Sequence, residues 1–113
     1  MLVEPGNHLL IVHRRLFETD HSRFFVGKVE GYDCGIARVS GYSYGRDHLN
    51  SKFIRKPDLR TKLIGITSGS LIIYCLPNDI SLDDVAFDVT EAGLKLNCPP
   101  NVSLNLSEYF HLH

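Results

Sequence analysis

Short groups of polar residues are the first places where this sequence could support catalysis. Residues 19–22, Thr-Asp-His-Ser, set a carboxylate, an imidazole and a hydroxyl in succession, and Asp47-His48 is a second acid–imidazole pair. Cys34 stands in a glycine-flanked turn and would be a reactive thiol if a neighbouring group lowered its pKa. Side chains adjacent in sequence seldom converge, and such residues in loops usually form turns. The sequence therefore assigns no catalytic residue, and an enzyme with an unrecognised site is the third of three functions considered.

Six histidines raise the question of a metal site. His111 and His113 stand two positions apart, so both imidazoles would lie on one side of a strand. Zinc takes three or four protein ligands, and no third ligand accompanies this pair. The chain has no Cys-x-x-Cys and no His-x-x-x-His spacing. We expect no metal and no other cofactor.

The cysteines and the apolar segments indicate a compartment. Cys34, Cys75 and Cys98 are odd in number and widely spaced, which favours free thiols in a reducing environment. The first residues lack the basic start and apolar middle of a signal peptide. No stretch approaches the roughly 20 apolar residues of a membrane helix. We expect a cytoplasmic protein without membrane contact.

Composition is that of an ordinary globular domain. The 113 residues include 12 Lys and Arg against 13 Asp and Glu, a net charge of −1, and 43% are hydrophobic. This balance excludes a disordered tail and a strongly basic nucleic-acid protein. A chain of this length is expected to form a single domain over residues 1–113.

Alternating apolar residues, interrupted by Gly, Asn and Asp, predict a mainly β fold. We expect a small antiparallel barrel or half-open sandwich of five to seven short strands with one or two short helices. The segment 81–92 fits a short helix slightly better than a strand, because its apolar residues follow helical spacing and its start is acidic. The predicted strands are 8–17, 23–30, 36–44, 60–67, 70–76, 94–97 and 102–106, with a basic connector at 52–57.

A two-residue turn at Ser68-Gly69, between two apolar β-rich runs, predicts a hairpin. Both faces of the paired hairpin would be apolar, so both must be covered. Leaving the second face in water would forgo roughly 25 cal/mol per Å² of burial. The cover would come from the segment 81–92, from an opposite sheet, or from another copy of the chain. This second apolar face consists of Leu63, Ile72, Tyr74 and Leu76.

The second and third predicted strands form another hairpin, which carries cations beside aromatic rings. Val29 is expected opposite Ala37 on an inner apolar face, with Lys28 opposite Arg38 on an outer, open face. A one-residue slip would exchange these faces. Rings that stack on bases and cations that neutralise phosphates are typical of single-strand nucleic-acid modules. The residues of this candidate surface are Lys28, Arg38, Tyr42, Lys52, Arg55, Lys56, Arg60 and Lys62.

Two functions of different classes therefore remain open. We favour a non-enzymatic binding domain that associates with itself, as a homodimer or other homo-oligomer, or with another protein, through the second apolar face. The alternative is binding of a nucleic acid or other polyanion, supported by a net charge of +4 on residues 1–62 against −5 on residues 63–113. Apolar association should persist at high salt, whereas phosphate contacts should weaken.

Overall fold

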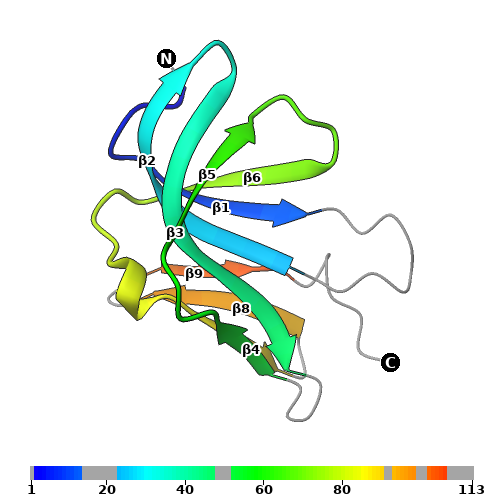
Figure 1. The fold of residues 1–113 in the computed structure, drawn as a ribbon. Helices are drawn as coiled ribbons and strands as arrows, with labels where there is room; N and C mark the ends of the chain where they lie inside the picture. The colour runs from blue at the N-terminus through cyan, green and yellow to red at the C-terminus, as the bar shows by residue number, and fades with distance from the viewer. Residues whose placement is uncertain (1, 14–22, 48–51, 91–92, 99–101, 107–113) are drawn as a thin grey trace.

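Nine strands in two antiparallel sheets make up the part of the chain that the computed structural model describes, residues 2–13, 23–47, 52–90, 93–98 and 102–106 (Figure 1). The larger sheet runs β4-β3-β2-β1-β6, with β5 paired to β3, and the smaller runs β7-β8-β9. The predicted half-open sandwich is confirmed, with nine strands instead of the five to seven expected, and the sheet does not close into a barrel. The strands are β1 (His8–His13), β2 (Arg23–Asp33), β3 (Ile36–Asp47), β4 (Lys52–Arg55), β5 (Arg60–Gly65), β6 (Leu71–Leu76), β7 (Ala86–Thr90), β8 (Gly93–Cys98) and β9 (Val102–Asn105).

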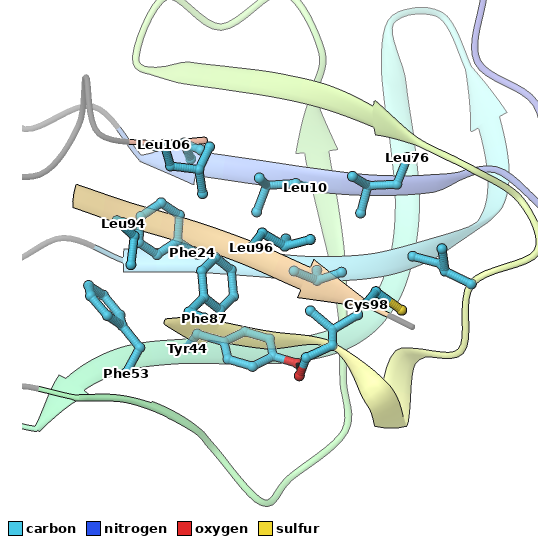
Figure 2. Close-up of a cluster of buried hydrophobic side chains, with 14 residues drawn as sticks. Leu10, Phe24, Tyr44, Phe53, Leu76, Phe87, Leu94, Leu96, Cys98 and Leu106 are labelled. Atoms are coloured by element: carbon cyan, nitrogen blue, oxygen red, sulfur yellow. Dashed lines mark hydrogen bonds between the residues drawn. The ribbon is translucent and has the colours of Figure 1, made fainter. Parts of the chain in front are cut away.

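A first hydrophobic core fills the space between the two sheets (Figure 2). Strand β8 shows why: Leu94, Leu96 and Cys98 alternate along it and are at most 1% exposed, whereas Lys95 and Asn97 between them are half-buried. Phe24 of β2 and Phe87 of β7 meet across this space with ring centroids 4.9 Å apart. The smaller sheet is therefore held to the larger one by apolar packing.

A second core lies on the opposite face of the larger sheet. The sheet curls, so that side chains of its outer strands β5 and β6 pack with those of the central strands in one cluster. Residues 66–70 join the two outer strands (Figure 1). Strands β1 and β2 thus bury side chains on both faces, which explains the continuous apolar run of β1. The buried members of the second core are Val3, Leu9, Ile11, Phe25, Val29, Ala37, Val39 and Ile64.

The β2–β3 hairpin has the predicted faces but a different register. Val29 pairs with Val39, not with Ala37, and Lys28 pairs with Ser40, not with Arg38. The register shifts between Val29 and Gly31, a β-bulge, and the strands continue to a tight turn at residues 34–35. The resulting offset is even, and an even offset returns each side chain to its own face. The inner face is therefore the predicted one.

The predicted hairpin around Ser68-Gly69 is wrong. Strand β5 pairs with β3, from Ile36 opposite Gly65 to Gly41 opposite Arg60, and β6 pairs with β1 instead. The connection contains two tight turns, with Ser68 N–H donating to the Gly65 carbonyl and Leu71 N–H to the Ser68 carbonyl. Alternation defines the faces of a strand but not its partner, so it did not predict that β5 pairs with β3 and β6 with β1.

The helix favoured for the segment 81–92 is also wrong. Only Leu82–Asp84 form a helical turn, of 3₁₀ type, and the Ser81 side chain makes no capping hydrogen bond. The chain then extends as β7, with Phe87 buried between the exposed Ala86 and Asp88. This strand completes the smaller sheet, because β-branched and aromatic residues at alternating positions pack better on a sheet than on a short helix. The basic connector likewise contains strand β4, which pairs with the end of β3.

Candidate functional site

Three of the four residues of the predicted second apolar face pack inside the protein, and the fourth is exposed to solvent. Ile72 and Tyr74 are half-buried against the first core, and Leu76 belongs to it. The smaller sheet thus supplies an internal cover for these three residues. Leu63 of β5 is 73% exposed on the far part of the same face, diagonal to Ile36, which is 48% exposed.

The basic residues predicted for the alternative function also lie in different parts of the structure and do not form one surface. Lys28 and Arg38 are exposed on the outer face of β2 and β3. Arg55 lies over the Tyr42 ring, 4.4 Å from its centroid, and pairs with Asp83 at 3.4 Å. The predicted open face is partly covered, since the Phe24 ring beside it is buried by the smaller sheet. The side chain of Lys52 lies outside the described residues.

The remaining three basic residues come together at one end of the curled sheet. They line a pocket of about 440 Å³, here called the basic pocket, where β1 ends, β2 begins and the β4–β5 connection runs along the edge of β3. This volume lies within the usual range for small-molecule sites. Its lining residues are His13, Arg23, Phe24, Phe25, Ser43, Tyr44, Gly45, Lys56, Pro57, Asp58, Arg60 and Lys62.

Local geometry explains how these side chains meet. Strand β3 pairs with β4 near its end and with β5 nearer its start, so the connection between them passes Ser43. Lys56 N–H donates to the Ser43 carbonyl at 2.8 Å and holds the connection beside β3. Lys62 then points from β5 to the inner face, where its ammonium lies 4.7 Å from the Phe25 ring centroid and donates to the Ser43 hydroxyl at 3.4 Å.

The basic pocket has a large excess of positive charge. Arg23, Lys56, Arg60 and Lys62 face one carboxylate, Asp58, which gives a formal charge of +3 with His13 neutral. Arg60 pairs with Asp58 at 3.5 Å, both groups being largely exposed. Within the described part of the chain, no carboxylate lies within ion-pair distance of the other three cations. Like charges that no described carboxylate pairs with repel one another, so an anion would be stabilised here.

Burial, together with the positive charge of the pocket, determines the protonation states of two of its lining residues, His13 and Tyr44. Burial lowers the pKa of His13 below its usual value of 6.5, and the charges of Arg23 and Lys62 lower it further. His13 is therefore neutral near pH 7 in the unliganded protein. Burial likewise raises the pKa of Tyr44 to about 12, so its hydroxyl is protonated. That hydroxyl donates to the Val85 carbonyl at 3.4 Å.

A second histidine with a lowered pKa lies away from the basic pocket. His8 is 6% exposed and pairs in register with Lys28 and Leu76. Burial is the larger cause of its lowered pKa, and the Lys28 charge is the smaller. Its Nδ1 atom is buried without a hydrogen-bond partner. Burial opposes protonation of the His8 imidazole, and the described residues around it form no cluster of groups for catalysis.

Most of the residues considered for catalysis or metal binding are outside the part of the chain that the structure describes. Residues 19–22, His48, His111 and His113 lie outside the described residues. Cys34 is exposed in the β2–β3 turn with a φ of 49°, Cys75 is exposed and Cys98 is buried. The described residues contain no group of three His, Cys, Asp or Glu side chains able to hold a metal. They also form no helix of the length and apolarity needed to span a membrane.

Comparisons with protein-family models, curated proteins and solved structures found no match. The site must therefore be judged from its own geometry. Lys56, Arg60 and Lys62 were among the residues predicted from sequence, but Arg23 and His13 were not. Because His13 and Arg23 flank the β1–β2 connection, antiparallel pairing of those strands was the pattern that could have placed them together.

Proposed function

We propose that this chain is a non-enzymatic binding domain that takes an anionic ligand in the basic pocket. The observation that carries the proposal is the meeting, among the residues that the structure describes, of four cations with a single carboxylate around a pocket of about 440 Å³. The half-buried Lys62 ammonium is held by a ring and a hydroxyl, both neutral groups. A desolvated cation without a counter-ion gains most from an added anion.

Binding of polyanion probes tests this function. Inorganic tripolyphosphate and a labelled single-stranded oligonucleotide are each titrated into the protein at about 50 mM and about 200 mM salt. We expect at least one probe to bind, with an affinity that falls as salt rises. Lys62→Glu should reduce the affinity at least about tenfold, equivalent to 1.4 kcal/mol.

The control is Lys28→Glu, which makes the same charge change on the opposite face of β2 and should leave the affinity within about twofold at fixed salt. Failure of both probes to bind would overturn the proposal. Equal losses in the two variants would also overturn it, because they would indicate attraction by net charge alone.

Self-association remains a second proposal, now supported by the exposed Leu63 and Ile36 on neighbouring strands. A homodimer joined there should keep its mass at high salt and dissociate on Leu63→Arg. Sedimentation of the protein at micromolar concentration measures this, and the mass of one chain at both salt concentrations would exclude it. The odd number and wide spacing of the three cysteines support action in a reducing compartment such as the cytoplasm.

A further inference from the structure

Aromatic rings at the basic pocket are not available for stacking. Phe24 and Phe25 line it but are each 1% exposed, so their faces are covered by the protein. Tyr42, the ring predicted to stack on bases, lies under the Arg55 guanidinium instead. Within the described residues the pocket thus lacks the platform on which single-strand modules stack successive bases. Its polar groups suit phosphate and not nucleobase.

The cations converge on one volume instead of following a groove. Arg23 at the start of β2, Lys56 on the β4–β5 connection, and Arg60 and Lys62 on β5 reach the same pocket from three segments. Two guanidinium groups can each hold a phosphate through two parallel hydrogen bonds, and the ammonium groups add point charges. A formal charge of +3 exceeds what one phosphate group neutralises.

We propose that the ligand of the basic pocket is a compact small molecule with two or more phosphate groups, bound by Arg23, Arg60 and Lys62. This inference rests on the proposed anion-binding function and adds the ligand class. In this proposal the phosphate groups lie among the four cations. Ser43 and His13 line the same pocket.

Binding of such a ligand takes up a proton at His13. Burial is the largest cause of the low pKa of His13, and the cations Arg23 and Lys62 that face it lower this pKa further; Lys56, Arg60 and Asp58 also lie around the pocket. A bound polyanion cancels the repulsion from the cations and so favours the imidazolium form. Affinity must then rise as pH falls through the range of the His13 pKa, by at most about tenfold per pH unit.

Calorimetric titration with inorganic tripolyphosphate tests the inference. We expect one site per chain, with tighter binding than orthophosphate and competition against the labelled oligonucleotide. Arg60→Gln, at a largely exposed position where folding is not at risk, should weaken binding about tenfold. Asp58→Asn removes the only carboxylate among the described lining residues and should strengthen it.

The affinity measured as a function of pH, for the parent protein and for His13→Gln, separates the effect of His13 protonation from the effect of ligand ionisation. The ligand titrates equally with parent protein and with His13→Gln, so the ratio of their affinities isolates the histidine. We expect this ratio to increase as pH falls below 6.5, the usual histidine value. A constant ratio would overturn the assigned proton uptake.

The outcomes distinguish this inference from the function on which it rests. Binding of the oligonucleotide without binding of tripolyphosphate would overturn the compact ligand and leave the anion-binding function in place. Tripolyphosphate binding that Arg60→Gln and Lys62→Glu leave unchanged would overturn the pocket as its site. Absence of binding by either probe would overturn both proposals.

Discussion

Replacing Phe24 with alanine is expected to lower the free energy of unfolding by about 3–5 kcal/mol, the usual cost of removing a buried aromatic side chain. The Phe24 ring is 1% exposed and stacks on Phe87 of the opposite sheet. It also meets the Phe53 ring edge-on, with centroids 5.4 Å apart (Figure 2). The substitution removes both aromatic contacts and leaves a cavity that neither sheet can fill without moving.

Urea denaturation followed by circular dichroism measures this loss. The control is Leu63→Ala, which truncates a side chain that is 73% exposed and should change the free energy of unfolding by no more than about 0.5 kcal/mol. A loss below about 1 kcal/mol for Phe24→Ala would contradict the packing of the two sheets around this ring.

Gly41→Ala is expected to destabilise the protein by at least about 3 kcal/mol. Gly41 lies opposite Gly27 in the β2–β3 ladder, where the two backbones approach closely. A Cβ atom on Gly41 would lie 1.9 Å from the Val26 carbonyl oxygen and 2.4 Å from the Gly27 Cα. Backbone atoms must move to admit it, and the curl of the larger sheet depends on this approach.

The control for Gly41→Ala is Gly65→Ala, at the end of β5. A Cβ atom there meets nothing within 4 Å, and the backbone needs no positive φ. We expect this substitution to be neutral or to stabilise by up to about 1 kcal/mol, since alanine restricts the unfolded chain. Thermal denaturation compares the two variants, and similar melting temperatures would contradict a close approach at Gly41.

Period-two alternation predicted most of the sheet faces correctly. Phe25, Val29 and Ala37 were placed together and do share the second core. The register of their hairpin was wrong because the bulge after Val29 cannot be read from residue types. The pairing of β5 was wrong because its apolar residues suit β3 and β6 equally well, and only the curl of the whole sheet decides between them.

The candidate site was predicted in part. Basic character identified Lys56, Arg60 and Lys62, which do meet. The same criterion included Lys28 and Arg38, which lie on the other face, because composition does not report the side on which a side chain emerges. Arg23 was missed since a single cation at a strand start has no local pattern to distinguish it.

Strands β1 and β2 form a wall common to both cores. If one core loosened alone, β1 and β2 would lose the packing on one of their two faces, and the other core would be destabilised as well. Partial opening is therefore disfavoured, and the domain should unfold as one unit. A molecule held at the curled end would consequently slow amide exchange in the three-stranded sheet, although no residue of that sheet is among those that line the pocket.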